Sequence, residues 1–241
     1  MDSPATFYTS LRRSRTVPQP AAPLTVPFFT DFSGPNASPI SDDAGVTALW
    51  RRANNSWLNV RKVGGVARPT ALTGGSVDNY ALLDASKFAG GIPNNIEVIA
   101  TLDIGSGTTQ EHEILLRASD NANAPDGEAR CYEFLYNAAS AAVDIVKWLG
   151  PFNQGPGTSF SSIGINDATP GTGATGNQIR ATAIGSALTF YWRAVSTDAW
   201  TQISHATDSG YASGTCGIGF FPTGAANIDA LGFTDYLVNA L

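Results

Sequence analysis

Apolar and polar residues alternate at a period of two through most of the stretch from Gly176 to Phe221. Residues 179–183 form one alternating run, and residues 188–195 form a second. Successive side chains of a β-strand point to opposite faces, so both runs are typical of strands that bury one face. Gly185-Ser186 lies between them, and glycine at the first position of a two-residue loop favours a hairpin turn. The stretch therefore predicts antiparallel strands of an all-β protein.

The same alternation recurs along the chain from residue 28 onward. Together with 25 glycines, 14 prolines and 14% charged residues, it favours many short strands joined by turns. We expect roughly a dozen strands, which is enough for a two-sheet antiparallel jelly-roll sandwich over residues 28–241. Residues 150–177 are rich in Gly, Pro, Ser and Thr, which is typical of a long functional loop. The expected strands are 28–32, 57–60, 80–84, 96–104, 114–118, 132–136, 143–148, 179–183, 188–195, 200–206, 215–221 and 228–233.

Residues 1–27 are expected to form an extended arm without a core of its own. Five prolines in this segment remove backbone donors and favour extended backbone. The arm carries a charge of +2, which leaves −8 for the rest of the chain, so the body has no electrostatic basis for binding nucleic acid. An arm of this composition is expected to dock on a protein partner. The docking residues are Phe7, Tyr8, Leu11, Arg12, Arg13 and Arg15.

The order of turns and strands resembles a known superfamily. The segment Phe28–Phe32 has an F-x-D-F-like pattern, and residues 112–121 (HEILLRASDN) and 129–137 (ARCYEFLYN) form a potential central hairpin. Residues 208–219 (DSGYASGTCGIG) follow with a polar loop and a final glycine-rich strand. This sequence of motifs resembles concanavalin A-like and laminin-G-like jelly-roll domains, of the kind found in tailed-phage virion proteins. The resemblance covers about residues 28–238 and implies the fold more strongly than the function.

The catalytic patterns of relatives with this fold are interrupted in this chain. Glucanases of the superfamily carry Glu-x-Asp-x-Glu on one strand, because alternation then places all three carboxylates on one face. Here Glu111-His112-Glu113 is followed by Leu115 where the third carboxylate belongs. The lyase pattern Gln-x-His is also broken, since Gln202 is followed by Ser204. We therefore expect no enzymatic activity.

No cofactor or metal is expected. His112 and His205 are the two histidines, and no Cys/His spacing suits zinc. A structural calcium between Asp31 and Asp235 is a weaker alternative to two ordinary surface aspartates. Cys131 and Cys216 lie in expected strands and are interpreted as buried thiols, with a disulfide as the alternative.

The tryptophans divide into two groups. Trp50, Trp57 and Trp192 fall within or beside apolar alternation and are interpreted as core. Trp148 ends an expected strand, while Trp200 and Tyr211 flank a turn-rich segment. Rings at such positions can stack on a sugar, so these three are the candidate ligand-binding residues, with packing under a loop as the alternative.

The function expected from these observations is that of a non-enzymatic virion structural protein. It would decorate a phage head or tail, with the arm attached to other virion proteins in a multicopy or oligomeric assembly. Weak binding of cell-surface polysaccharide is the expected outward role. The N-terminus lacks the apolar segment of a secretion signal, and no run reaches the roughly 20 apolar residues of a membrane span, so localisation to the virion without membrane contact is expected. The alternative is a carbohydrate-active protein, either a glycan-binding module or a glycoside hydrolase of the same fold.

Overall fold

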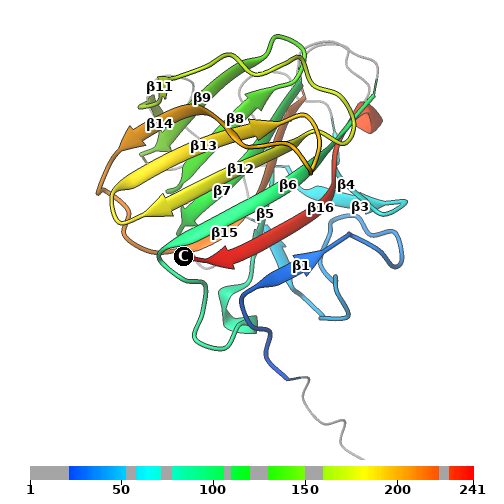
Figure 1. The fold of residues 1–241 in the computed structure, drawn as a ribbon. Helices are drawn as coiled ribbons and strands as arrows, with labels where there is room; N and C mark the ends of the chain where they lie inside the picture. The colour runs from blue at the N-terminus through cyan, green and yellow to red at the C-terminus, as the bar shows by residue number, and fades with distance from the viewer. Residues whose placement is uncertain are drawn as a thin grey trace, which may run out of the picture.

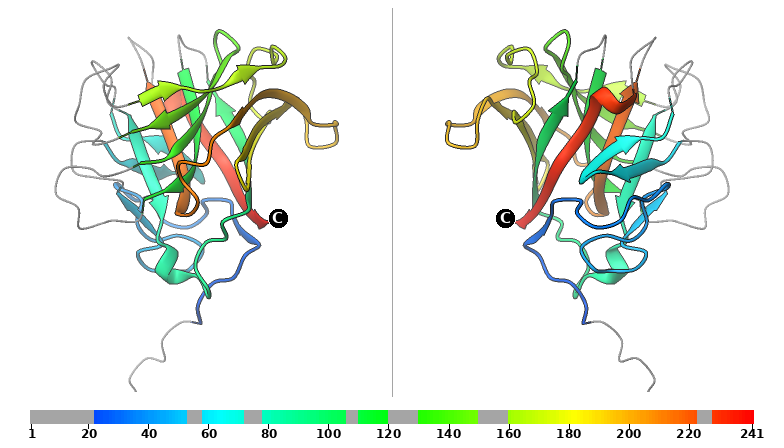
Figure 2. Two further views of the ribbon diagram at one scale, coloured as in Figure 1. Left: turned by 90° about the vertical axis from the view of Figure 1, so that its left-hand side faces the viewer. Right: turned by 90° about the vertical axis from the view of Figure 1, so that its right-hand side faces the viewer.

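The structure is a computed structural model, and it describes residues 22–52, 58–71, 78–105, 110–119, 130–149, 160–222 and 228–241. The fold is the expected all-β antiparallel sandwich of two sheets. Figure 1 shows the sheets stacked face to face, with β12, β13 and β6 in front of β7, β8 and β9. The side views in Figure 2 show the two layers edge-on.

The larger sheet contains nine strands within the described residues. Its order is β11-β14-β13-β12-β6-β16-β4-β3, with β1 paired to β16. The bounds are β1 (Phe28–Thr30), β3 (Val60–Val63), β4 (Val66–Pro69), β6 (Ile96–Ile104), β11 (Ile165–Asn166), β12 (Gln178–Ile184), β13 (Ala187–Arg193), β14 (Thr201–Thr207) and β16 (Leu231–Ala240).

The smaller sheet contains seven strands within the described residues, in the order β10-β9-β8-β7-β15-β5-β2. The bounds are β2 (Trp50–Arg52), β5 (Asn79–Leu83), β7 (Gln110–Ala118), β8 (Tyr132–Asn137), β9 (Ala142–Trp148), β10 (Phe160–Ser162) and β15 (Thr215–Pro222). Two short 3₁₀ helices, η1 (Ala85–Lys87) and η2 (Ile228–Ala230), complete the described elements.

The alternation in the sequence sets the core between the sheets. Along β6 the side chains are alternately buried and half-buried, as the pattern predicts. The hairpin of β12 and β13 is also confirmed: Ile184 pairs with Ala187, and Gly185 adopts a φ of +55° that glycine tolerates at no steric cost. Large side chains from both sheets fill the interior and are fully buried, among them Phe190, Tyr236 and Phe134.

The C-terminal strand differs from the expectation. A strand is predicted over 228–233, whereas residues 228–230 form η2 and the strand β16 runs on to Ala240. This long strand lies between β6 and β4 and also pairs with β1, so that tertiary pairing extends it well past the apolar run that marked it in the sequence. Trp57 and the docking residues of the arm lie outside the described residues.

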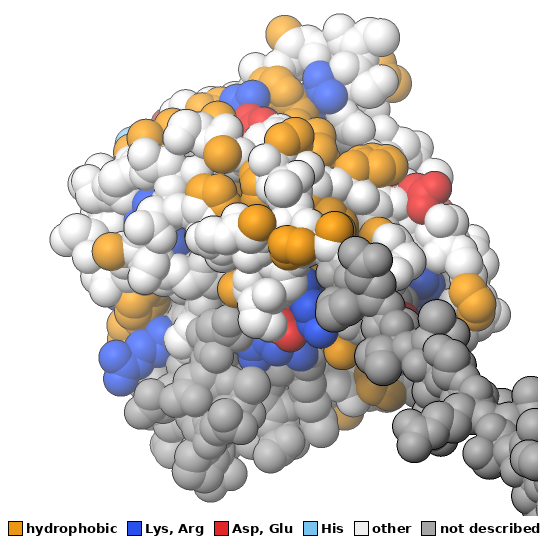
Figure 3. Space-filling model, turned by 90° about the horizontal axis from the view of Figure 1, so that it is seen from below, with side chains coloured by type: hydrophobic (Ala, Val, Ile, Leu, Met, Phe, Trp, Pro, Cys, Tyr) orange, Lys and Arg blue, Asp and Glu red, His pale blue; other side chains and the backbone are white. Residues whose placement is uncertain are grey.

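The described end of the arm is attached to the body. Leu24 forms a parallel bridge with Phe88; its N–H donates to the carbonyl of Lys87 at 2.8 Å, and its carbonyl accepts from Ala89. Leu24 and Val26 also pack against the core. Seen from below, this end of the molecule carries interspersed hydrophobic and basic side chains and few acidic ones (Figure 3). The attachment to the body therefore begins before residue 28.

The smaller sheet has a second apolar surface, on the face turned away from the larger sheet. We call this the outward face. Its side chains form a separate buried cluster against which Phe160 packs. The cluster consists of Tyr80, Leu82, Leu115, Ala118, Cys131, Val146 and Trp148. The free face of an antiparallel sheet is commonly polar and exposed to water, so a buried apolar cluster on the outward face is unusual.

Candidate functional site

The outward face carries a small cavity of about 130 Å³, which we call the outward cavity. Its floor is formed by the buried side chains of Asp78, Glu133, Val146 and Trp148, and its rim by the half-buried side chains of Glu111, Leu135, Phe160 and Phe221. Aromatic rings and carboxyl groups therefore line the same space.

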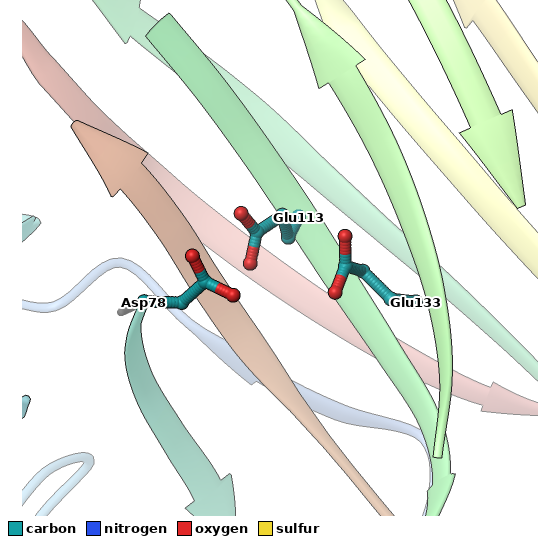
Figure 4. Close-up of side chains that lie close together, drawn as sticks. All are labelled: Asp78, Glu113 and Glu133. Atoms are coloured by element: carbon teal, nitrogen blue, oxygen red, sulfur yellow. The ribbon is translucent and has the colours of Figure 1, made fainter. Parts of the chain in front are cut away.

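Three carboxyl groups meet beside this cavity. Oxygens of Asp78, Glu113 and Glu133 all lie within 4.8 Å of one another, and these three residues are the acidic cluster. Figure 4 shows the carboxyl groups turned toward each other, with Glu113 on β7, Glu133 on β8 and Asp78 just before β5.

The strand register explains how distant residues come together. On β7 and β8, Leu115 lies opposite Glu133 and Glu113 opposite Leu135, so the two glutamates are diagonal neighbours on one face. On the other side of β7, the strand β15 places Gly219 opposite both Glu113 and Tyr80. A Cβ atom on Gly219 would lie 2.2 Å from a carboxyl oxygen of Glu113 and 2.3 Å from the Tyr80 ring. The glycine therefore provides the space into which the cluster projects.

Glu133 and Glu113 differ in their hydrogen bonds. The Tyr80 hydroxyl and the Trp148 indole N–H each donate to Oε2 of Glu133 at 2.5 Å. Both carboxyl oxygens of the fully buried Glu113 lack a hydrogen-bond partner. Within the described residues, no Lys or Arg forms an ion pair with any member of the cluster. A buried carboxylate without partners is costly, so the cluster must hold protons or a positively charged ligand.

The pKa values follow from this environment. Burial raises the pKa of Glu133 to about 7, while its bonds from Tyr80 and Trp148 act in the opposite direction. Burial, and then repulsion by Glu133, raise the pKa of Glu111 to about 7. Burial and repulsion by neighbouring acids raise the pKa of Asp78 and of Glu113 well above the ordinary values. Carboxyl groups with shifted pKa values beside a cavity are typical of a functional site.

The residue between the two glutamates of β7 faces the other way. His112 is fully buried toward the core, where its Nε2 lies 3.1 Å from the carbonyl of Gly232. Burial lowers the pKa of His112 to about 3, so it is neutral at physiological pH. The other histidine, His205, pairs with Asp167 at the exposed edge formed by β14 and β11.

The three predicted ligand-binding aromatics lie in different places. Trp148 lines the outward cavity, is 5% exposed and packs on Phe160 with ring centroids 5.0 Å apart. Tyr211 packs on Tyr132, and its hydroxyl donates to the carbonyl of Trp148. The structure therefore joins Tyr211 to Trp148 through the backbone rather than through the cavity.

Trp200 belongs to the opposite side of the sandwich. It stacks with the guanidinium groups of Arg180 and Arg193, which lie 5.0 Å and 4.1 Å from its ring centroid. Arg180 lies on β12 between the core residues Ile179 and Ala181, so it projects from the outer face of the larger sheet.

The remaining candidates are the two aspartates considered for calcium and the two cysteines. Asp31 and Asp235 are brought near each other by the pairing of β1 with β16, and burial raises the pKa of Asp235 with a small contribution from Asp31. They do not form a three-ligand group in the described part of the chain. Cys131 and Cys216 are free, buried thiols. Cys131 packs in the apolar cluster of the outward face, and Cys216 packs in the core between the sheets.

Two larger hollows, of about 400 and 470 Å³, lie among residues 22–87. One of them reaches Asp43 and Lys62, but these two charges already pair with each other at 3.2 Å. Neither hollow is lined by an aromatic ring among the described residues. The outward cavity is smaller, yet it combines rings with carboxyl groups that lack a counter-charge among the described residues.

The sequence pattern indicates Glu111 and Glu113 as carboxyl groups on one strand, but it does not indicate Asp78, Glu133 or the rim rings Phe160 and Phe221. A signal was present in β8 (YEFLYN), where the buried Glu133 lies at an outward position between the aromatic residues Tyr132 and Phe134. An acid in such a strand is unusual enough to mark a site.

Comparisons with known proteins support the fold. No family model matches the chain, and no curated protein matches it. Three solved structures illustrate the likeness. The first is the GH43 BlXynB protein from Bacillus licheniformis, at 13% identity and a TM-score of 0.53; the likeness covers 88% of this chain but 39% of that one. Since identity is so low, the likeness shows the fold alone.

The second is the CBM2 module of the evolved Dit of Lactobacillus casei BL23 phage J-1, at 13% identity and a TM-score of 0.52, covering 88% of this chain and 93% of the module. The third is the exoplasmic/lumenal domain of VIP36 in a Ca²⁺/Man2-bound form, at 9% identity and a TM-score of 0.53, covering 88% and 86%. In the described residues, no helix has the length and apolar character to cross a membrane.

Proposed function

We propose that this chain is a non-enzymatic glycan-binding module of a phage particle, and that the outward cavity is its sugar subsite. The observation that carries the proposal is the joint lining of this cavity by aromatic rings and carboxyl groups. Rings stack on the C–H face of a sugar, while carboxylates accept hydrogen bonds from its hydroxyl groups.

The size of the cavity favours weak binding. At about 130 Å³ it is smaller than the roughly 300–1,000 Å³ of pockets that enclose a whole small ligand. A sugar would therefore sit over the half-buried rim residues Glu111, Phe160 and Phe221 and reach Glu133 with one hydroxyl. A stacked sugar contributes about 1–2 kcal/mol, which corresponds to millimolar or weaker affinity for one site. Many copies on one particle would raise the effective concentration and give useful avidity.

The assignment to a phage particle rests on the likeness to the phage Dit module, whose whole length is nearly matched. Residues 1–27 would attach the domain to other virion proteins, with the docking set Phe7, Tyr8, Leu11, Arg12, Arg13 and Arg15, which lies outside the described residues. Because Leu24 and Val26 pack on the body, the docking segment is best tested by deleting residues 1–21. Such a deletion should preserve the melting temperature and abolish incorporation into the particle; normal incorporation would refute the docking role.

Glycoside hydrolysis is a second candidate because of one observation. Carboxyl oxygens of Glu113 and Glu133 lie within 4.8 Å, close to the roughly 5–5.5 Å of retaining glycosidases, and the pKa of Glu133 is about 7. However, Glu113 is fully buried, so a glycosidic bond would have no access to it. The broken Glu-x-Asp-x-Glu pattern points the same way, and we therefore favour binding without turnover.

The test is a glycan array of bacterial surface polysaccharides probed with monomeric and multivalent full-length protein. We expect weak signals from the monomer and strong signals from the multivalent form. Phe160→Ala and Glu111→Gln should remove most of the signal, because both residues line the rim of the cavity. Trp200→Ala is the matched control, since it removes a ring from the opposite face of the sandwich.

Three outcomes would overturn the proposal. Absence of binding by the multivalent form would leave the domain with a structural role alone. Loss of binding in Trp200→Ala but not in Phe160→Ala would place the sugar site on the larger sheet. Hydrolysis of β-glucans, galactans or alginates that disappears in Glu133→Gln would replace binding by the hydrolase alternative.

A further inference from the structure

We propose that the acidic cluster is a binding site for a hard divalent cation, with Ca²⁺ as the best-fitting ion, held by Asp78, Glu113 and Glu133. This inference goes beyond the proposed function, because a cation site is independent of whether a sugar binds. It stands on the geometry of the three carboxyl groups, on the unpartnered side chain of Glu113 and on the charge balance of the outward face.

The spacing of the oxygens suits a calcium ion. Ca²⁺ binds oxygen at about 2.3–2.6 Å, so two ligands on opposite sides of the ion are separated by up to about 5 Å. One oxygen from each of the three residues lies within 4.8 Å of the others, which allows a single ion to contact all three. In Figure 4 the carboxyl groups converge on a common space over β15, β7 and β8.

The absence of hydrogen-bond partners at Glu113 among the described residues supports a cation site independently of the oxygen spacing. The Glu113 side chain is fully buried and aimed into this space, and neither of its carboxyl oxygens has a hydrogen-bond partner. Buried polar atoms in proteins nearly always have partners, so an orphaned carboxyl group at the centre of a cluster indicates a missing ligand. Gly219 preserves the required space, because any larger residue there would meet the Glu113 oxygen.

The charge balance points to a cation. Three ionised carboxylates with no ion pair to a described Lys or Arg would repel one another in a medium of low dielectric constant. A divalent ion would offset most of that charge. The opposite case is visible elsewhere in the molecule, where the buried Asp43 is paired directly with Lys62.

The ligand set selects the class of ion. All three ligands are carboxylate oxygens, which suit Ca²⁺, Mg²⁺ or Mn²⁺ better than the softer metals. The nearby His112 faces the core and is not available as a nitrogen ligand. The spread of the oxygens and the presence of large carboxylate side chains favour Ca²⁺ over the smaller Mg²⁺, which demands a tighter octahedron.

A bound ion would fix the floor of the outward cavity. Asp78 and Glu133 belong both to the cluster and to the cavity, and Glu133 also accepts from Trp148. The ion would hold β5, β7 and β8 in register on this face and keep Glu133 ionised as a hydrogen-bond acceptor.

The test uses the full-length protein, stripped with EDTA and without any glycan, at pH 8. Melting temperature is measured against CaCl₂, MgCl₂ and MnCl₂. At a Ca²⁺ concentration about 100 times the dissociation constant we expect the melting temperature to rise by roughly 5–10 °C. Terbium ions should also bind and give luminescence sensitised by Trp148, whose indole is hydrogen-bonded to the ligand Glu133.

Variants locate the ion. Glu113→Gln and Asp78→Asn should each weaken Ca²⁺ binding about tenfold or more, because each removes one charged ligand. Asp235→Asn is the matched control: this half-buried carboxyl group lies on β16 of the other sheet, so its loss should leave affinity unchanged. Reduced terbium emission in Trp148→Phe with unchanged Ca²⁺ affinity would place the ion beside the indole.

Three results would overturn the proposal. The first is the absence of any shift in melting temperature with all three ions, which would mean that the cluster holds protons. The second is unchanged affinity in both Glu113→Gln and Asp78→Asn. The third is loss of binding in Asp235→Asn, which would move the ion to the opposite sheet. None of these results decides whether the protein binds glycans, because glycan binding is measured separately on an array in the presence of EDTA.

Discussion

Two buried carboxyl environments in this molecule differ in how their charge is satisfied. Asp43 accepts from Thr30 at 2.8 Å and from the indole of Trp50 at 3.0 Å, and it pairs with the Lys62 ammonium group. Lys62 in turn donates to the carbonyls of Ser33 and Asp42. The acidic cluster on the outward face has comparable burial but no such counter-charge among the described residues, and Glu113 lacks hydrogen-bond partners altogether.

The difference separates a structural role from a functional one. The Asp43–Lys62 pair links the loop before β2 to β3, and each of its polar atoms has a use within the fold. In the part of the chain that the structure describes, the acidic cluster forms no ion pair, and it faces a cavity lined by rings. Removing one partner of a satisfied buried ion pair is strongly destabilising, whereas buried carboxyl groups with shifted pKa values beside a cavity are typical of a ligand site.

The largest expected effect comes from breaking the satisfied pair. Asp43→Ala leaves the Lys62 ammonium group buried without its partner, and we expect a loss of about 3–5 kcal/mol in the free energy of unfolding. Urea denaturation at pH 7 measures it. Glu113→Gln, the matched change in the other region, should leave stability unchanged or increase it in metal-free protein, because it removes repulsion. Equal losses of unfolding free energy in Asp43→Ala and Glu113→Gln would show that the two carboxyl environments do not differ in this way.

The second prediction concerns pH. The folded-state pKa values of Glu111 and Glu133 are about 7, above the ordinary value of 4.5, so the folded protein keeps protons that the unfolded chain has released. Stability of metal-free protein should therefore fall as pH rises from about 4.5 through about 7. Unfolding free energies at several pH values test this, and Glu133→Gln should flatten the decline. A rise in stability across this window that Glu133→Gln leaves unchanged would contradict the shifted values.

The third prediction tests the space around Glu113. Gly219→Ala places a methyl group against the Glu113 oxygen and the Tyr80 ring and should cost about 1–3 kcal/mol through overpacking. Gly185→Ala is the comparison, since nothing lies within 4 Å of its added Cβ and the cost of about 1 kcal/mol comes from its positive φ alone. Thermal denaturation of both variants distinguishes overpacking from backbone strain. A loss in Gly219→Ala smaller than the loss in Gly185→Ala would mean that the cluster is loosely packed.

The smallest expected effects come from single hydrogen-bond donors. Thr30→Val removes the donor to Asp43 and should cost about 1–2 kcal/mol, because it leaves a buried carboxylate oxygen less satisfied. Tyr80→Phe removes the donor to Glu133 and should cost about 1 kcal/mol or less at pH 5, where Glu133 is protonated. Its cost should grow at pH 8. A Tyr80→Phe cost that does not change with pH would show that Glu133 carries the same charge at both values.

The sequence allows the fold to be predicted in some detail. Alternation located β6, β12 and β13, and the Gly185 turn between β12 and β13, because periodicity and turn chemistry are local properties. The end of β16 was missed, since pairing with neighbouring strands extends it beyond its apolar run.

The site could be predicted only in part. Alternation correctly places Glu111 and Glu113 on one face of β7. The Glu-x-Asp-x-Glu pattern, however, predicts a third carboxyl group only on that same strand. Glu133 arrives through the register between β7 and β8, and Asp78 arrives across β15, and neither register can be derived from local pattern. Trp148 was identified as a candidate from its place at a strand end, and it does line the outward cavity.

A ¹³C NMR titration of the glutamate side-chain carboxyl carbons in metal-free, full-length protein measures directly whether the acidic cluster lacks a counter-charge. We expect Glu133 to titrate near pH 7 and Glu113 to titrate well above 4.5, because both groups are buried together without a counter-charge among the described residues. Assignment by Glu133→Gln and Glu113→Gln identifies the two signals. If both groups instead titrate near 4.5, the outward face is hydrated or already neutralised, and the central claim of an unsatisfied acidic cluster is wrong.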